Sequence, residues 1–235
     1  MSYRFFLDAD IVENRISLEG DQAYHAIQVM RLKVGDTLTL FNGRGTEHAA
    51  VIVGSTKKKL DLEVRSTTHH PPAKKYLSIA CALPKGDRQK FLVEKLVELG
   101  VSRLIPLQTR RSVAIGNQKV IERMKKHVIE SSKQCGRNFL MEIEHQCTVD
   151  RLIETVPDSC ARFVADPYSD SDLQLADSDE PVVIAIGPEG GFEPGESERF
   201  AVANWQPMRM GHHILRIETA AIAAAVLLGM GNAGE

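Results

Sequence analysis

Short stretches in the first part of the chain alternate between apolar and polar residues. Residues 37–41 and 60–64 show this period of two, and turn-forming residues 42–45 separate such segments. The alternation predicts strands with one buried face, so we expect residues 4–65 to form a small β-barrel or sandwich. Within it, residues 21–31 carry apolar side chains at helical spacing, which predicts one helix with Asp21 as its N-cap.

A different pattern begins after the His-His-Pro-Pro-Ala segment at residues 69–73, which we interpret as a linker. Apolar runs now alternate with amphipathic segments, as in an α/β domain with a largely parallel sheet. The segment 87–99 predicts a helix that buries Phe91, Leu92, Leu96 and Leu99 and turns Arg88 towards solvent. Strands are expected at 76–83, 103–107, 162–165, 182–187 and 208–210, and further helices at 119–134, near Pro194 and at 220–228.

Composition narrows the class of protein. The 235 residues are 43% hydrophobic, enough for a substantial core in two domains, which we place at 1–73 and 74–235. No run approaches the roughly 18 apolar residues of a membrane span, and the first residues lack a signal-peptide core, so we expect a cytoplasmic protein without membrane association. The four cysteines form no C-x-x-C pair, which predicts reduced thiols and no metal site.

The net charge of −2 hides a strong asymmetry along the chain. Residues 74–138 contain fifteen Lys and Arg against five Asp and Glu, whereas residues 139–235 contain five against seventeen. The basic section either neutralises the acidic one across packed helices or forms a face that binds nucleic-acid phosphates. Both interpretations stay open at this point.

Two C-terminal segments carry the most specific signal. The first is Gly-Pro-Glu-Gly-Gly at 187–191, which follows the apolar run 182–186, and the second is Met-Gly-His-His-Ile-Leu-Arg-Ile-Glu-Thr-Ala at 210–220. Glycines at the end of a buried strand let the backbone approach a ligand closely, and open α/β sheets bind ligands at such ends. The loop lacks the G-x-G-x-x-G spacing of a dinucleotide site.

These segments resemble the RsmE family of the SPOUT methyltransferases, whose hallmarks are a GPEGG loop and an LGxRILRTETA segment. Lys85 to Arg88 and Gln134 to Asn138 also match family positions, whereas Met210, His213, Ile217 and Lys133 depart from the family pattern. The resemblance implies methylation of N3 of a uridine in the 16S rRNA of the small ribosomal subunit, with S-adenosyl-L-methionine as cofactor. It also implies an α/β SPOUT domain with a trefoil knot, a PUA-like N-terminal β-barrel and a homodimer.

Site residues follow from the chemistry of methyl transfer, which needs a bound cofactor and removal of the N3 proton. We expect Arg216 to stabilise charge on the uracil, and Glu218 to orient Arg216, to accept a proton, or simply to favour the helix start. Main-chain groups suit adenine and ribose. The residues expected to bind the cofactor are Gly187, Pro188, Glu189, Gly190, Met210, Gly211 and Leu215.

The RNA is expected to meet basic residues in both domains, of which the resemblance favours Arg111 and Arg137. The RNA-binding candidates are Arg4, Arg31, Lys33, Arg110, Arg111 and Arg137. The alternative to an enzyme is a non-catalytic RNA-binding or ribosome-assembly protein with a degenerate knot. Titration with the cofactor would separate the two.

Overall fold

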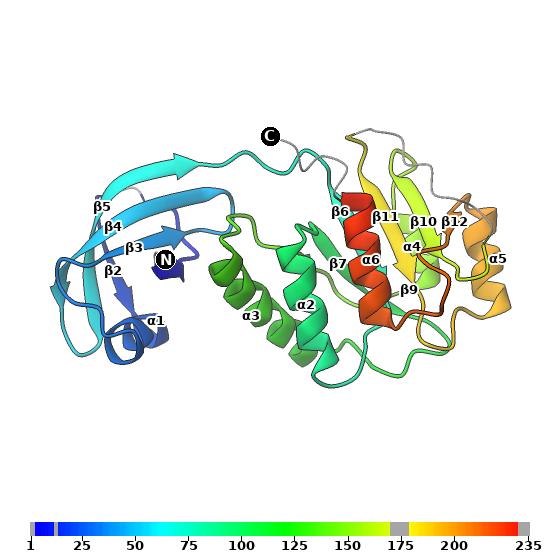
Figure 1. Ribbon diagram of the computed structural model, residues 1–235, viewed down its shortest axis with the longest axis horizontal. Helices are drawn as coiled ribbons and strands as arrows, with labels where there is room; N and C mark the ends of the chain where they lie inside the picture. The colour runs from blue at the N-terminus through cyan, green and yellow to red at the C-terminus, as the bar shows by residue number, and fades with distance from the viewer. Residues whose placement is uncertain (1–2, 12–13, 170–178, 230–235) are drawn as a thin grey trace. The chain divides into compact units, whose positions relative to one another are not determined.

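The chain divides into two compact units in the computed structural model, which describes residues 3–11, 14–169 and 179–229 (Figure 1). Unit 1 consists of Met1–Pro72 together with Ser132–Leu140, and unit 2 of Ala73–Ser131 together with Met141–Glu235. Helix α3 (Gln118–Cys135) therefore begins in unit 2, and its last turn belongs to unit 1. The sequence did not predict this return of the chain to its first unit.

Unit 1 is a curled five-stranded sheet in the order β1-β3-β4-β5-β2, as expected from the alternating pattern. Its neighbours pair antiparallel except β1 with β3. The inward residues, among them Phe5, Leu38, Leu40, Ile52 and Leu62, form one apolar core. The strands are β1 (Tyr3–Phe6), β2 (Arg15–Glu19), β3 (Thr37–Phe41), β4 (Thr46–Ser55) and β5 (Lys59–His69).

The helical segment of unit 1 differs in detail from the prediction. It consists of α1 (Gly20–Tyr24) and a following π-helical turn (His25–Val29), and Ala23 and Ala26 are its buried residues. Glu19 occupies the N-cap, so the expectation of Asp21 as N-cap is wrong; Asp21 lies in the first turn instead. An acidic side chain there still favours the positive end of the helix.

The turn between β3 and β4 binds the segment Ser132–Leu140, by which the chain returns to unit 1. Gly45 N donates to the carbonyl of Asn138, and Leu140 N donates to the carbonyl of Gly43, both at 3.0 Å. Both glycines have positive φ, and a Cβ atom on either would collide with Phe139 or Leu140. The glycines are therefore needed for their backbone conformation and for the space they leave.

Unit 2 is built on a parallel sheet in the order β12-β10-β11-β6-β7-β8, with β9 also paired to β7. The strands predicted at 76–83, 103–107, 162–165 and 182–187 are confirmed with small shifts at their ends, whereas the one predicted at 208–210 shares only Met208 with the observed β12. The strands are β6 (Leu77–Cys81), β7 (Arg103–Gln108), β8 (Glu142–Ile143), β9 (Cys147–Thr148), β10 (Ala161–Ala165), β11 (Val182–Ile186) and β12 (Gln206–Met208).

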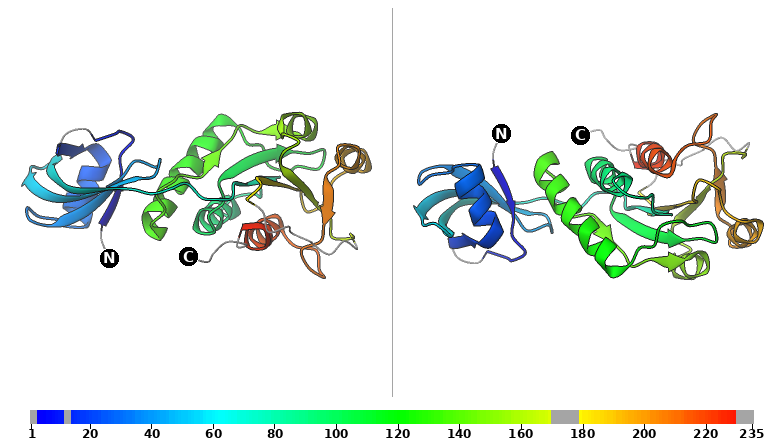
Figure 2. Two further views of the ribbon diagram at one scale, coloured as in Figure 1. Left: turned by 90° about the horizontal axis from the view of Figure 1, so that it is seen from above. Right: turned by 90° about the horizontal axis from the view of Figure 1, so that it is seen from below.

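Helices cover both faces of this sheet. Figure 2 shows α2 (Arg88–Glu98) and α6 (Ile217–Gly229) on one face and α4 (Val149–Thr155) and α5 (Pro194–Val202) on the other. On the α4 and α5 side, Leu152 and Phe200 pack against sheet residues such as Ile105 and Val183. This three-layer arrangement is what the alternating apolar pattern predicted.

Helix α2 buries Leu92 and Leu96 as expected, but Leu99 is only partly buried and the rest of the core face differs from the prediction. Its buried residues are Gln89, Leu92, Val93, Leu96 and Val97. Phe91 is 44% exposed, so its predicted burial is wrong. The core face also runs through positions 89, 93 and 97, and the sequence pattern did not show this because Gln89 is polar. The buried Gln89 side chain accepts a hydrogen bond from Arg123 at 2.7 Å, which satisfies its polar group.

Among the described residues, no helix is long and apolar enough to cross a membrane. Within the same ranges, no group of three or more His, Cys, Asp or Glu side chains is arranged to hold a metal ion. The four cysteines are free thiols.

Candidate active site

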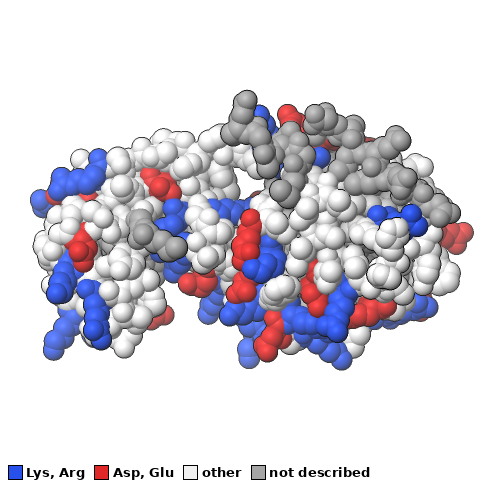
Figure 3. Space-filling model, in the orientation of Figure 1, with Lys and Arg blue, Asp and Glu red and all other residues white. Residues whose placement is uncertain are grey.

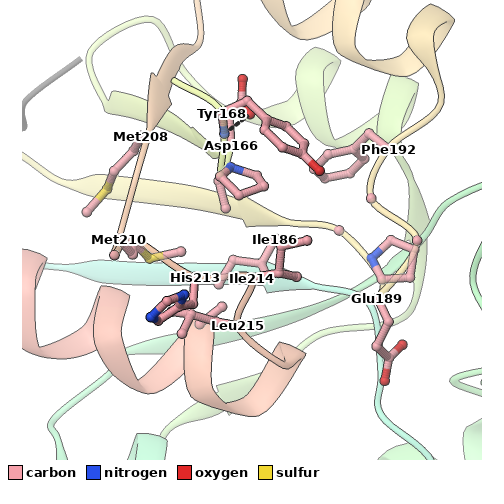
Figure 4. Close-up of a pocket in the computed structure, with 18 residues that line it drawn as sticks. Asp166, Tyr168, Ile186, Glu189, Phe192, Met208, Met210, His213, Ile214 and Leu215 are labelled. Atoms are coloured by element: carbon pink, nitrogen blue, oxygen red, sulfur yellow. Dashed lines mark hydrogen bonds between the residues drawn. The ribbon is translucent and has the colours of Figure 1, made fainter. Parts of the chain in front are cut away.

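A cavity of about 190 Å³ opens at the carboxyl ends of β10, β11 and β12, beside the start of α6 (Figure 4). Three segments far apart in sequence form its wall: residues 165–168, the glycine loop 186–192, and residues 208–215. This is the edge where open parallel sheets bind ligands. All seven residues expected to bind the cofactor line this cavity: Gly187, Pro188, Glu189, Gly190, Met210, Gly211 and Leu215.

The glycine loop keeps its shape because aromatic side chains support it. Gly191 N donates to the carbonyl of Pro188 at 2.8 Å, which closes a turn. Phe192 packs edge-on against Phe200 with 5.0 Å between ring centroids, and a Cβ atom on Gly187 would lie 3.2 Å from the Phe192 ring. The backbone at Gly187 thus packs directly against the Phe192 ring, and its other side faces the cavity.

A buried carboxylate joins the glycine loop region to the loop after β7. Glu196, 3% exposed, accepts hydrogen bonds from the backbone N–H of Arg110 at 3.0 Å and of Glu193 at 2.9 Å. Arg111 Nη1 donates to the carbonyl of Gly190 at 2.6 Å. These bonds tie the loop after β7 to the glycine loop and to the start of α5.

Another pocket, of about 230 Å³, adjoins this cavity at the glycine loop. Pro188 and Glu189 line both it and the cavity, and the remaining lining residues are Leu83, Pro84, Lys85, Arg88, Val113 and Ile217. In Figure 4 the Glu189 carboxylate points away from Met210 and His213. It meets Arg88 Nη1 at 3.1 Å.

Arg88 is shared between two carboxylates. Besides Glu189, its Nη1 lies 3.7 Å from Oε2 of Glu218, whose side chain is only 8% exposed. Arg88 was expected to face solvent; its side chain is 38% exposed, but from the first turn of α2 it also reaches the start of α6. Glu218 pairs with Arg88 and not, as one expectation had it, with Arg216. The exposed Arg216 side chain lines neither pocket.

Comparison with known proteins identifies the family. Residues 71–229 match the RNA methyltransferase domain family, and residues 18–65 match the RNA methyltransferase PUA domain. The chain is 33% identical over 94% of its length to ribosomal RNA small subunit methyltransferase E of Rickettsia conorii, and covers 92% of that protein. It is 29% identical over 88% of its length to the protein of the same name from Bacillus subtilis, covering 87% of it.

The chain belongs to the ribosomal RNA small subunit methyltransferase E family. Two solved structures share its fold over 98% of both chains. The family enzyme from Neisseria gonorrhoeae, bound to S-adenosyl methionine, superposes with a TM-score of 0.90 at 25% identity. A Legionella pneumophila protein in complex with the bound cofactor SAM gives 0.86 at 26% identity. The expected PUA-like unit followed by an α/β methyltransferase domain is thereby confirmed, while the trefoil knot stays a prediction.

The RNA-binding candidates of this methyltransferase E chain lie in both units. Arg31 and Lys33 are exposed in unit 1. Arg4 is mostly buried: its side chain is 13% exposed, and its Nη atoms donate to Glu47 at 2.6 Å and Asn138 at 2.7 Å. Arg137 is partly buried in unit 1, and burial lowers its pKa.

In unit 2, Arg110 and Arg111 are exposed beside the glycine loop. The surface in Figure 3 shows Lys and Arg side chains along the lower edge of this unit, interspersed with Asp and Glu. Charge along this edge is therefore mixed, and both interpretations of the basic section stay open, as do the RNA-binding roles.

Sequence reasoning missed one part of the cavity wall. Asp166, Pro167 and Tyr168 follow β10 and line the cavity, and the Asp166 side chain accepts a hydrogen bond from Tyr168 N at 2.9 Å. The signal was available, because a carboxylate followed by proline directly after a predicted parallel strand lies at the ligand-binding edge of the sheet.

Proposed function

We propose that this protein methylates 16S rRNA of the small ribosomal subunit at N3 of a uridine, with S-adenosyl methionine as methyl donor. One observation carries the proposal: the seven residues nominated for the cofactor surround a single cavity at the ligand-binding edge of the sheet. Family membership supports it, as do two whole-chain structural relatives that hold this cofactor.

The residues around the cavity fit the cofactor. Ile186, Met210 and Leu215 provide apolar surface for the adenine ring, and the backbone of the glycine loop offers donors and acceptors. Asp166 adds a carboxylate that can accept hydrogen bonds from ribose hydroxyls. When bound, the cofactor supplies an electrophilic methyl group, and the protein's task is to exclude water, orient the acceptor and stabilise its charge.

The proposal extends to the partners. The substrate is rRNA in the small subunit, contacted by Arg31, Lys33, Arg110, Arg111 and Arg137, so the protein would work in the cytoplasm. We further propose a homodimer that packs through α6, whose small residues permit close helix approach, and the trefoil knot of the SPOUT fold. Val226 and Leu227 are 37% and 43% exposed on this helix, which leaves apolar surface for a second copy.

Two measurements test this function. Calorimetric titration with S-adenosyl methionine should show saturable binding, and mass spectrometry of nucleosides should find 3-methyluridine in unmethylated small subunits after incubation with protein and cofactor. RNA binding without cofactor binding or methylation would instead favour the assembly protein. Light scattering that gives only the 26.0 kDa monomer at micromolar concentration would contradict the dimer.

A further inference from the structure

We propose that the pocket adjoining the cofactor cavity at Pro188 and Glu189 receives the substrate base, and that Arg88 is the cation that stabilises negative charge on it. This inference rests on the proposed function and assigns a catalytic role that the sequence had given to Arg216. It concerns three charged side chains in unit 2: Arg88, Glu189 and Glu218.

The pocket lies next to the cofactor cavity. Pro188 and Glu189 line both, so the two pockets adjoin at these residues of the glycine loop. Methyl transfer requires this proximity of donor and acceptor. The apolar side chains of Leu83, Val113 and Ile217 suit a planar ring, whereas the cations Lys85 and Arg88 suit the two carbonyl oxygens that flank N3 of uracil.

The guanidinium of Arg88 lies between an exposed and a buried carboxylate, unlike the cation of an ordinary surface ion pair. On the exposed side it contacts Glu189, and such a pair contributes little stability by itself. On the buried side lies Glu218, whose Oε2 has no hydrogen-bond partner among the described residues. At 3.7 Å from Arg88 Nη1, that oxygen is too distant for a hydrogen bond.

A buried carboxylate of this kind is costly unless a cation stays near it. We therefore assign Glu218 as a positioning residue that keeps the Arg88 guanidinium at the pocket wall. Arg88 itself retains N–H donors for a substrate, because guanidinium carries five and only one bond, to Glu189, is formed within the described residues.

Methyl transfer to the uracil then takes place in two steps, deprotonation and substitution. The N3–H of the uracil loses its proton to water, and the resulting anion is delocalised onto the two carbonyl oxygens beside Arg88. N3 forms a bond to the methyl carbon while the carbon–sulfur bond breaks, and the sulfur keeps the electron pair. Because charge develops on the base before the transfer, a fixed cation lowers the barrier.

The test uses the full-length protein in single-turnover methylation of reconstituted small subunits. Their 16S rRNA is transcribed with either UTP or 5-fluoro-UTP, since fluorine makes the N3 proton more acidic. The variants are Arg88→Gln, Arg88→Lys, Glu218→Gln and Arg216→Ala. Arg199→Gln is the matched control, because Arg199 forms a comparable half-exposed pair with Asp150, at 2.8 Å, and lines neither pocket.

Arg88→Gln should lower the rate by about 100-fold while affinity for S-adenosyl methionine stays within several-fold. Its pH–rate profile should shift to higher pH, and its deficit should shrink on 5-fluorouridine rRNA, because an anion that forms more readily needs less stabilisation. Arg88→Lys should recover part of the rate, since lysine keeps the charge without the planar fork. Glu218→Gln should shift the profile the same way, and Arg199→Gln should behave as wild type.

Several outcomes would overturn the assignment. Wild-type turnover in Arg88→Gln would do so, as would an equal deficit on both rRNAs with an unshifted pH profile. So would a shifted profile with fluorouridine rescue in Arg216→Ala but not in Arg88→Gln. If Arg88→Gln does not fold, the pH profile and fluorouridine response of Arg88→Lys decide. A wild-type protein that neither binds cofactor nor methylates subunits would remove the proposed function along with this inference.

Discussion

The Arg111 guanidinium donates to the carbonyl oxygen of Gly190 at 2.6 Å, across 79 residues of sequence. Arg111 was nominated for RNA, yet its contact is with the glycine loop that lines the cavity. The fit is close, because a Cβ atom on Gly190 would lie 3.3 Å from Cδ of Arg111. The loop after β7 thus helps to set the shape of the cofactor cavity.

Arg111→Ala should weaken binding of S-adenosyl methionine by roughly tenfold, because a lost charge-assisted hydrogen bond of about 1.5 kcal/mol leaves the glycine loop less ordered. The side chain is about half exposed, so the melting temperature should change little. Titration calorimetry measures the affinity. Arg110→Ala is the control, since the bond from residue 110 to Glu196 uses its backbone N–H and survives the substitution; equal losses in both variants would contradict the idea.

Glycines offer a second test of the cavity wall. Gly187→Ala should reduce cofactor affinity, because the new methyl group would lie 3.2 Å from the Phe192 ring and 3.3 Å from its backbone nitrogen, so the loop must shift. Gly195→Ala in the first turn of α5 meets nothing within 4 Å and should preserve affinity, with stability raised by up to about 1 kcal/mol. Unchanged affinity in Gly187→Ala would show that the loop adapts freely.

Much of the fold followed from the sequence because local patterns carried it. The apolar run before Gly187 predicted β11, and Pro194 with Glu196 predicted the start of α5, whose first residue is that proline. Helix α4 was missed although Thr148 caps it and its core residues Val149 and Leu152 lie at helical spacing. At seven residues it is shorter than the windows in which a helical period stands out.

The same distinction between local patterns and long-range packing applies to the residues of the site. The cofactor candidates lie in two continuous segments that follow strands, so topology alone brings them to one edge. Arg88 is different: 101 residues separate it from Glu189 in the glycine loop, and the packing of α2 beside α6 brings it to Glu218. A helical period can place a charged residue near the boundary of an apolar face, but it cannot tell which partner that residue meets.

The buried thiol of Cys81 predicts a loss of stability in alkaline solution. Burial raises the pKa of Cys81 to about 12, so the folded state keeps the thiol protonated while the unfolded chain ionises at its ordinary pKa of about 8.5. This contribution is complete below about pH 8.5 and is lost progressively as the pH rises towards 12.

Cys81→Ala should therefore flatten the decline in the free energy of unfolding between pH 8.5 and 11, measured by urea titration at each pH. Part of the decline should remain, because burial and Glu142 raise the pKa of Tyr76 to about 12 as well. Cys135→Ala, which removes an exposed thiol, should keep the wild-type slope. An unaltered slope in Cys81→Ala would contradict this assignment.

The turn that holds the returning segment of unit 1 allows the sharpest comparison. Gly45 and Gly35 have nearly equal φ values, 94° and 97°, but only at Gly45 does a Cβ atom collide with a neighbour, the Phe139 ring. Alanine at either position costs about 1 kcal/mol or more from backbone strain. Gly45→Ala should cost a further 1–3 kcal/mol, roughly the penalty of overpacking, because Phe139 must leave its place.

Thermal and urea unfolding of the two alanine variants measures this difference, and Phe139→Ala completes a double-mutant cycle. In the Phe139→Ala background the cost of Gly45→Ala should fall, although not fully to that of Gly35→Ala, because the carbonyl of His70 would still lie 3.0 Å from the new Cβ. Equal costs for Gly45→Ala and Gly35→Ala would mean that Phe139 does not hold residues 138–140 against the turn. The end of α3 would then be held to the curled sheet by the backbone bonds of Gly43 and Gly45 to residues 140 and 138 and by the bond of Arg4 to Asn138.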